Sequence, residues 1–180
     1  IDSNGDLHMV YSHATIEKLY YSTESQTDST GWSSSEILSN SNLTASPSIW
    51  FEGADMHILY RDSNLNSLEH LVKSGGGTWS TETELTSGLA VGMEHVALQL
   101  NNGTTLVATT VNNSGTLALQ ILDIDHDVST TLRNLSDGTA ELSMCMDSSN
   151  TIVLLSMDSN GILVTHEWDA STELWTNVSM

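Results

Sequence analysis

Short runs of apolar residues recur along the whole chain, and clusters rich in Asn, Asp, Gly and Ser separate them. Many runs alternate apolar and polar positions, which predicts β-strands, and the clusters predict turns. Two runs correspond residue for residue, because His8 and His57 are 49 residues apart, as are Tyr11 and Tyr60. A fixed offset of this kind indicates an internal structural repeat.

The repeat continues through the chain with a period of 46 to 49 residues, and a complete unit holds four predicted strands. We place the units at about residues 1–45, 46–93, 94–140 and 141–180. Four antiparallel strands in every roughly 40 to 50 residues are typical of a β-propeller blade. The sequence therefore predicts a single all-β domain over residues 1–180, a β-propeller made of about four four-stranded antiparallel blades.

The phase of the repeat leaves the first unit short of a strand, because only Ile1 and Asp2 precede its first turn. We therefore expect about fifteen strands and one blade without its first strand. Two explanations stay open: the chain is part of a larger propeller, or another chain completes the ring and covers the open sheet edge. Since the sequence begins inside a motif and without Met, we expect a mature or excised piece of a longer protein.

The charge balance is strongly acidic, with 4 Lys and Arg against 23 Asp and Glu and a net charge of −19. So few cations exclude the basic surface that nucleic-acid binding requires, and they argue against binding to anionic membranes. No apolar run reaches the roughly 18 residues of a membrane-spanning helix, so we expect no membrane insertion. An acidic surface suits a protein in salt-rich fluid, and we expect an extracellular or cell-surface location.

The cysteine and the tryptophans divide into core and surface candidates by their positions in the repeat. Cys145 is the only cysteine, and its place in an apolar alternating run predicts a small buried residue. Trp32, Trp79 and Trp175 take equivalent positions on the fourth strand, which predicts core packing. The remaining tryptophans lie outside this register, so they are candidates for exposed rings that stack on a sugar: Trp50 and Trp168.

A second group of candidates follows the repeated histidine in the second unit. Arg61 is one of two arginines in the chain, and such a side chain binds a carboxylate or sugar hydroxyls, or pairs with a nearby acid. The predicted ligand-binding cluster consists of His57, Tyr60, Arg61 and Asp62. The alternative for the repeated residues is structural: His8 and His57 hydrogen-bond a neighbouring turn or blade, and the tyrosines pack between blades.

Two acidic segments place oxygen atoms at alternate positions, as calcium-binding loops do. The first offers Asp2, Asn4 and Asp6, and the second runs from Asp123 to Asp127. Neither segment has the glycine and distal glutamate of an EF-hand, and the first also reads as a plain Asn-Gly turn. Calcium is therefore the one cofactor that the sequence suggests, and the first segment is the candidate metal site.

With these repeats in view, the chain resembles the sialidase-type propeller repeats, also called BNR or Asp-box-like repeats. The Asp-box of that family runs Ser-x-Asp-x-Gly-x-Thr-Trp in the turn between the third and fourth strands. Residues 74–79 keep its Gly-x-Thr-Trp ending without the Asp, and residues 27–32 keep an Asp and the Trp in a different spacing. The resemblance implies a secreted or surface propeller, and the fold alone does not determine its function.

A count of arginines excludes sialidase catalysis. The resemblance implies a site with three arginines, a Tyr–Glu pair and an acid/base Asp, and this chain has only Arg61 and Arg133. Another glycosidase would need two carboxylates across a cleft, and the sequence singles out no pair.

We therefore expect a non-catalytic recognition module that binds a glycan or an extracellular protein on a propeller face. Two alternatives stay open. One is a structural segment completed by another chain, including a homo-oligomer. The other is a glycoside hydrolase whose catalytic residues lie outside this segment.

Overall fold

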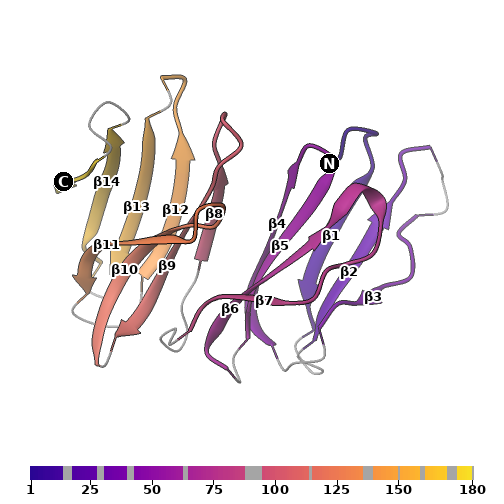
Figure 1. The fold of residues 1–180 in the computed structure, drawn as a ribbon, viewed down its shortest axis with the longest axis horizontal. Helices are drawn as coiled ribbons and strands as arrows, with labels where there is room; N and C mark the ends of the chain where they lie inside the picture. The colour runs from indigo at the N-terminus through magenta and orange to yellow at the C-terminus, as the bar shows by residue number, and fades with distance from the viewer. Residues whose placement is uncertain are drawn as a thin grey trace. The chain divides into compact units, whose positions relative to one another are not determined.

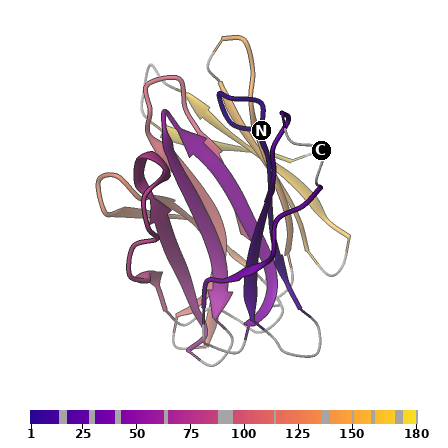
Figure 2. The same cartoon turned by 90° about the vertical axis from the view of Figure 1, so that its right-hand side faces the viewer.

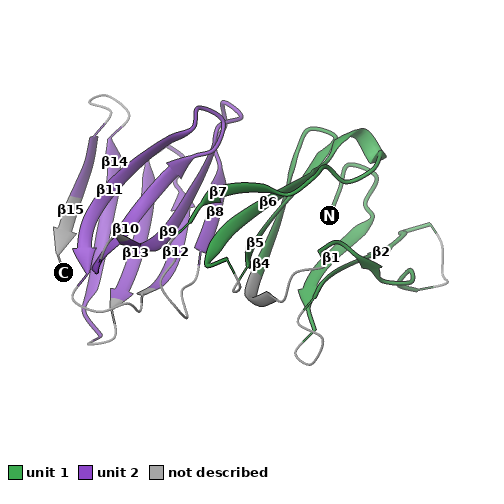
Figure 3. Ribbon diagram, turned by 60° about the horizontal axis from the view of Figure 1, so that its bottom comes forward, with its two compact units in different colours: residues 1–87 green, residues 88–180 purple. Residues whose placement is uncertain are grey.

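The structure, a computed structural model, shows an all-β chain. It describes residues 1–13, 18–27, 31–39, 43–62, 65–87, 95–113, 115–135, 140–149, 151–158, 161–169 and 174–179. The chain divides into two compact units, residues 1–87 and 88–180, which Figure 3 shows in green and purple. Among the described residues, no helix has the length and apolar character needed to cross a bilayer.

Unit 1 contains two antiparallel sheets whose strands follow one another in sequence order (Figure 1). Sheet 1 has three strands: β1 (Leu7–Ser12), β2 (Leu19–Glu24) and β3 (Glu36–Ile37). Sheet 2 has four strands: β4 (Leu43–Glu52), β5 (Asp55–Asp62), β6 (Ser67–Lys73) and β7 (Thr83–Thr86). A short 3-10 turn, Ser74–Gly76, follows β6.

Unit 2 repeats this arrangement with two four-stranded antiparallel sheets. Sheet 3 consists of β8 (His95–Gln99), β9 (Thr105–Asn113), β10 (Thr116–Asp123) and β11 (Val128–Leu135). Sheet 4 consists of β12 (Ala140–Met146), β13 (Ile152–Asp158), β14 (Leu163–Asp169) and β15 (Leu174–Ser179). In both sheets every strand pairs only with its neighbours in sequence, as in a propeller blade.

The described residues thus contain fifteen strands in four antiparallel sheets, and sheet 1 has only three of them. The predicted fold class is confirmed, and so is the missing strand of the first unit. In the described residues of sheet 1, the turn at residues 2–6 directly precedes β1. The single domain and its repeats at 1–45, 46–93, 94–140 and 141–180 stay predictions.

Within each unit the two sheets pack face to face. We call the face of a sheet that points to the sheet before it in sequence its preceding face, and the other its following face. In unit 1 the preceding face of sheet 2 contributes Ile58, Tyr60 and Leu71 to the core. They pack against Leu19 and Val10 on the following face of sheet 1, which overlies sheet 2 in Figure 2. Strand alternation explains this, since residues 58 and 60 share one side of β5.

Unit 2 buries the equivalent pair of faces. The preceding face of sheet 4 contributes Met144, Ile152 and Leu154, and the following face of sheet 3 supplies five partners. Those partners are Leu106, Ala108, Leu119, Ile121 and Leu135. Burial of such side chains provides about 25 cal/mol per Å² of apolar surface, so the inter-sheet layers are the main source of stability.

Acidic side chains organise the turns at one end of the sheets. Asp6, at the start of β1, accepts the backbone N–H of Gln26 at 3.0 Å. Asp55, at the start of β5, accepts the backbone N–H of Gly75 at the same distance. Donor and acceptor are both displaced by 49 residues. The first two repeats of this chain therefore share this bond between the strand start and the turn after the third strand of the repeat.

Two expectations about single residues are wrong. Cys145 is exposed, because alternation along β12 turns Met144 into the core and Cys145 to the opposite face. Trp32 is 45% exposed and precedes β3 rather than lying on it, whereas Trp79 and Trp175 do pack against the unit cores. Residues 28–30 of the second Asp-box-like segment lie outside the described residues.

A polar row lies at one end of the unit 1 core. Tyr60 pairs with Glu69 across β5 and β6, and Glu69 pairs with Glu84 across β6 and β7. The Tyr60 hydroxyl donates to Glu82. Burial is the larger cause, and this hydrogen bond the next, of a Tyr60 pKa well above its ordinary value. Burial also raises the pKa of the Glu69 carboxyl; a hydrogen bond from Ser67 opposes this rise, and the charges of Glu84 and Glu82 add to it. Folding therefore buries a carboxylate beside other acids.

Replacing Ile58 with Ala is expected to lower the free energy of unfolding by about 2–5 kcal/mol, because it leaves a cavity in the layer between sheets 1 and 2. Urea denaturation followed by circular dichroism measures this change. Leu65→Ala is the matched control, since Leu65 is 61% exposed and its replacement is expected to change stability by less than about 0.5 kcal/mol. Equal effects of the two replacements would contradict the assigned core.

Glu69→Gln is expected to stabilise the protein at pH 7 by roughly 1 kcal/mol, since it removes a buried charge and keeps a hydrogen-bonding oxygen. The pKa of Glu69 is higher in the folded state, so the wild-type penalty is present at neutral pH. The penalty fades as the pH falls through the raised folded-state pKa, and it is lost below the ordinary value of 4.5, where both states are protonated. Paired thermal melts at pH 7 and pH 4 test this, with the exposed Glu141→Gln as control. A Glu69→Gln advantage that is the same at both pH values would refute it.

Candidate functional site

A cavity of about 410 Å³ lies between sheets 3 and 4 of unit 2. Its walls come from the β8–β9 turn, the ends of β9, β10 and β11, and two tryptophans of sheet 4. The lining residues are Leu100, Asn102, Thr104, Leu106, Ile121, Asp123, His126, Val128, Thr130, Trp168 and Trp175. The site therefore depends on the packing of one sheet against the next.

Trp168 and Trp175 form the aromatic wall. They face each other across β14 and β15 as a register pair, and their ring centroids are 5.6 Å apart at an angle of 53°. Both rings are half-buried and pack against the unit 2 core, while they also line the cavity. Aromatic rings fixed in this way offer an apolar surface at little cost in conformational entropy.

Asp123 and His126 form a polar pair on the opposite wall. The Nδ1 atom of His126 lies 2.9 Å from Oδ2 of Asp123, and the His126 side chain is 66% exposed. The other oxygen, Oδ1, accepts the backbone N–H groups of Asp125 and His126 at 3.1 and 3.2 Å, which fixes the carboxylate in the turn. When Nδ1 carries the proton and donates to Asp123, Nε2 of His126 is an acceptor for a ligand hydroxyl.

Asn102 lies at the tip of the β8–β9 turn, which also lines the cavity. Its Oδ1 accepts the backbone N–H of Thr104 at 3.1 Å, so its amide NH₂ group is the part that can donate to a ligand. Leu100 and Thr104 close the turn with a backbone hydrogen bond of 2.8 Å. Gly103 has a positive φ of 93°, which a glycine adopts without strain. The predicted Asn-Gly turn therefore presents an amide to the cavity.

The combination of these groups sets what the cavity can bind. It offers two indole rings, an amide donor, a carboxylate and an imidazole, and no Lys or Arg is among its described lining residues. Planar polar side chains next to aromatic faces suit a neutral ligand with both hydroxyl groups and apolar C–H surface. Of the residues predicted to bind ligand, only Trp168 lies here.

Two of the other predicted ligand residues form a stack in sheet 2. The Trp50 and His57 rings have centroids 5.1 Å apart, and both rings stack on His70. Nδ1 of His57 lies 3.1 Å from Nε2 of His70, and its Nε2 lies 3.7 Å from Glu52. Trp50 is half-buried and its ring is engaged with these imidazoles. His57 is thus bonded to a residue on the next strand of its own sheet, and not to a neighbouring blade.

The cluster of His57, Tyr60, Arg61 and Asp62 is not gathered on one surface. All four side chains are buried, and alternation along β5 places His57 and Arg61 on one face, Tyr60 and Asp62 on the other. Asp62 accepts the backbone N–H of Leu65 at 3.3 Å. Ligand binding by these residues stays a prediction that the geometry does not favour.

Arg61 is buried without a carboxylate partner among the described residues. One of its terminal nitrogens donates to Oδ1 of Asn66 at 3.5 Å, and Nε has no hydrogen-bond partner. Burial lowers the pKa of the guanidinium, as expected for a cation removed from water. Among the described residues, Arg61 therefore has no ion pair with a nearby acid, which was one of the alternatives for this side chain.

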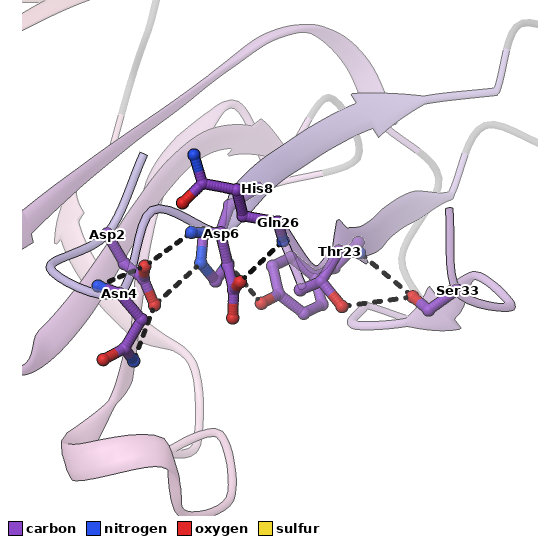
Figure 4. A network of polar contacts seen from close by, with 8 residues as sticks. Asp2, Asn4, Asp6, His8, Thr23, Gln26 and Ser33 are labelled. Carbon is purple, nitrogen blue, oxygen red and sulfur yellow. Dashed lines mark hydrogen bonds and ion pairs between the residues drawn. The ribbon is translucent and has the colours of Figure 1, made fainter. Parts of the chain in front are cut away.

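The candidate calcium site at Asp2, Asn4 and Asp6 is organised as a turn (Figure 4). Oδ1 of Asp2 accepts the backbone N–H groups of Asn4 and Asp6, both at 2.9 Å, and Oδ2 lies 3.4 Å from Nε2 of His8. Burial alone would raise the pKa of Asp2, but the backbone donors and the His8 ring outweigh it and lower the pKa. The carboxylate oxygens thus point to N–H groups within the turn.

The second acidic segment is used in the same way. Asp123 accepts from its own turn, and Oδ2 of Asp125 accepts the backbone N–H of Thr105 at 2.6 Å. Asp127 has a positive φ of 53°, typical of a turn position. Across the part of the chain that the structure describes, no three His, Cys, Asp or Glu side chains gather as ligands of one ion. Calcium binding remains a sequence-based prediction.

Unit 1 also has a cavity, of about 320 Å³, between sheets 1 and 2. Lys73 lines it and lies over two aromatic rings, with its Nζ 5.1 Å from the Tyr21 centroid and 5.3 Å from that of Trp79. Burial raises the pKa of Tyr21 to about 12, and the charges of Glu36 and two aspartates add to this. The hydroxyl of Tyr21, on the next strand of the same sheet, is bonded to Nδ1 of His8 at 2.7 Å. The cation of this cavity is therefore held by the chain's own rings.

Sequence reasoning missed most of the unit 2 site. It assigned Trp175 to the core alone, and it considered Asp123 only as a metal ligand. The available signal was the pair of tryptophans, Trp168 and Trp175, seven residues apart on the two arms of one predicted hairpin. Such arms place their rings directly opposite each other in only one register, and the sequence does not fix that register.

Comparison with known proteins supports the fold without naming a family. No protein-family model matches the sequence, and a search of curated proteins finds no significant match. A triple mutant of AofleA from Arthrobotrys oligospora matches 98% of the chain with a TM-score of 0.63 and 12% identity. TolB from Acinetobacter baumannii matches 98% with a TM-score of 0.58 and 12% identity. A thermostable family-43 glycoside hydrolase matches 99% with a TM-score of 0.56 and 10% identity.

The chain spans only part of these proteins: 54% of AofleA, 42% of TolB and 70% of the glycoside hydrolase. At such low identity the likeness shows the fold alone. These structures are β-propeller proteins, so the chain has a β-propeller fold, made of blades that pack face to face within each unit.

Proposed function

We propose that this chain is a non-catalytic recognition module that binds a neutral glycan in the cavity between sheets 3 and 4. The observation that carries this proposal is the pairing of two aromatic rings, Trp168 and Trp175, with the polar side chains of Asn102, Asp123 and His126 around one cavity. Sugar rings present apolar C–H faces for stacking and hydroxyl groups for planar hydrogen-bonding side chains.

Charge supports a neutral ligand over an acidic one. The chain carries a net charge of −19, and the cavity lining includes Asp123 but no Lys or Arg. An acidic sugar would have to approach against this field without a cation to receive its carboxylate. A neutral saccharide meets no such barrier.

The number of carboxylates supports binding over hydrolysis. Glycoside hydrolysis uses two carboxyl groups on opposite sides of the scissile bond. The described lining of this cavity holds one, Asp123, and its Oδ1 is committed to two backbone N–H groups. The likeness to a family-43 glycoside hydrolase supports a propeller fold that can accommodate a sugar. We do not extend the catalytic activity of that enzyme to this chain.

We further propose that recognition takes place outside the cell, on the basis of the strongly acidic composition. Descent from the sialidase-type repeats is a separate proposal. Its support is the Gly-x-Thr-Trp ending at residues 76–79, which follows β6 at the turn between the third and fourth strands. A protein ligand in the same cavity is the alternative. A uniformly negative glycan screen would favour this alternative over a glycan ligand.

A screen of neutral and acidic glycans with the labelled chain, followed by calorimetric titration of the best ligand, tests the function. We expect binding to neutral saccharides. His126→Ala is expected to weaken it at least tenfold, about 1.4 kcal/mol, because it removes one hydrogen-bonding group of the site. Trp168→Leu is expected to weaken it further, because it removes the stacking surface.

Trp32→Leu is the matched control for the tryptophan, since Trp32 is exposed and lies in unit 1. Thermal melts of each variant separate loss of the site from loss of the fold, and His126→Ala is expected to melt like the wild type because the side chain is mostly exposed. Glycan binding that survives both His126→Ala and Trp168→Leu would remove this cavity as the site.

A further inference from the structure

The cavity of unit 1 occupies the same place between its two sheets as the cavity of unit 2 does. Asp2 and Leu100 each donate a backbone N–H to the residue four positions later, which aligns the turn before β1 with the β8–β9 turn. This alignment matches Asn4 with Asn102, and each asparagine precedes a glycine of positive φ. Both asparagines line their cavities. One wall of each cavity is therefore built by the same kind of turn.

Strand register extends this match from the turns into sheets 1 and 3. In the same alignment Val10 corresponds to Ala108, and their partners on the next strand are Tyr21 and Ile121. Each of these two partners lines the cavity of its unit. Two further lining residues also correspond: His8 and Leu106. The unit 1 wall thus has a phenol and an imidazole where the unit 2 wall has aliphatic side chains.

Lys73 takes the place of Trp168 on the opposite wall. Lys73 pairs with Met56 of β5, and Trp168 pairs with Ile152 of β13. Two positions after each of these partners, the strand contributes a residue to the unit core. On their other side, Lys73 and Trp168 each pair with a tryptophan: Trp79 and Trp175. Unit 1 therefore has an ammonium group where unit 2 has an indole ring.

Aromatic rings position Lys73 without neutralising its charge. Its Nζ lies over the rings of Tyr21 and Trp79. A ring face attracts a cation, but it does not accept the ammonium N–H groups as a carboxylate does. Among the described residues Lys73 has no carboxylate partner, although the chain contains 23 Asp and Glu. The ammonium can therefore pair with an acid group of a ligand.

The facing wall of the unit 1 cavity offers hydrogen-bonding groups. Nε2 of His8 is buried and has no hydrogen-bond partner among the described residues. When the Tyr21 hydroxyl donates to Nδ1 of His8, Nε2 carries the proton and can donate to a ligand. Asn4 donates its amide N–H to Asp2 at 3.5 Å, so its Oδ1 can accept from a ligand hydroxyl.

We propose that the unit 1 cavity is a second ligand site, which binds a saccharide that carries a carboxylate. The carboxylate pairs with Lys73, the hydroxyl groups bond to His8 and Asn4, and the C–H surface contacts Phe51 and Met56. The cavity volume of about 320 Å³ lies within the range of small-ligand sites. The saccharide class rests on the function proposed for the equivalent cavity of unit 2, whereas the charge preference rests on Lys73.

Asp2 lines the same cavity and determines how such a ligand lies. Its Oδ1 accepts two backbone N–H groups, which compensates part of the charge within the turn. A ligand carboxylate next to Asp2 would still be repelled, so the acid group is expected on the sheet 2 side, at Lys73. This arrangement favours a sugar with a single carboxylate over a peptide with several acidic side chains.

Calorimetric titration of the 180-residue chain with short uronic-acid oligosaccharides tests this site. Their methyl esters are the matched neutral ligands, because they keep the sugar and remove the charge. We expect the acids to bind at least tenfold more tightly than the esters. Lys73→Gln is expected to weaken binding of the acids at least tenfold, about 1.4 kcal/mol, because it removes the ammonium group.

Lys18→Gln is the matched control, since it changes the net charge equally and Lys18 is not among the described lining residues. Lys73→Arg keeps the charge and is expected to retain binding, which separates loss of the cation from loss of the fold. The proposal is overturned if no uronic-acid oligosaccharide binds, if acids and esters bind equally, or if Lys73→Gln and Lys18→Gln have equal effects. Tighter binding of an Asp- and Glu-rich peptide would also overturn it.

Trp168→Leu distinguishes this site from the cavity of unit 2. It is expected to weaken binding of neutral saccharides and to leave binding of the acids unchanged, and Lys73→Gln is expected to do the reverse. Loss of acid binding in Trp168→Leu would place the acidic ligand in unit 2 and overturn the inference. Failure of neutral binding alone would refute only the function proposed for unit 2.

Discussion

The burial of one sheet face against the next sheet is the interaction on which the rest of the structure depends. A short four-stranded sheet has two apolar faces and cannot cover either by itself. In unit 1 Ile58 and Tyr60 find their cover on sheet 1, and in unit 2 Ile152 and Leu154 find it on sheet 3. This packing of sheet on sheet fixes the arrangement of the strands and of the cavities within each unit. A sheet face without a neighbouring sheet leaves its apolar side chains exposed.

The unusual acidity of the chain is partly explained by its turns. Oδ1 of Asp2 and of Asp147 each accept backbone N–H groups two and four residues later, and Asp6 and Asp55 each tie a strand to a distant turn. A carboxylate that accepts N–H groups in this way replaces hydrogen bonds that a turn cannot make with itself. The same pattern of alternating oxygens resembles a calcium loop in sequence, which is why sequence alone could not separate the two uses.

The strand count and fold class could be predicted because they follow from local rules: alternation, turn residues and a fixed offset. The site could not, because its walls come from sheets 3 and 4 and depend on register. Trp168 was predicted as a ligand-facing ring from its place outside the repeat, whereas Trp175 was assigned to the core. Trp175 both packs against the core and lines the cavity. Cys145 was misplaced for the same reason, since a run of apolar residues does not show which of two faces is covered.

The position of the candidate site follows from how the layers meet. Leu119 and Leu154 are fully buried in the layer between sheets 3 and 4. Trp168 and Trp175 are half-buried; they pack against this core and also line the cavity. Cavities therefore lie at sheet junctions beside a packed core, and their side chains differ between junctions: Lys73 with aromatic rings in unit 1, and tryptophans with an Asp–His pair in unit 2.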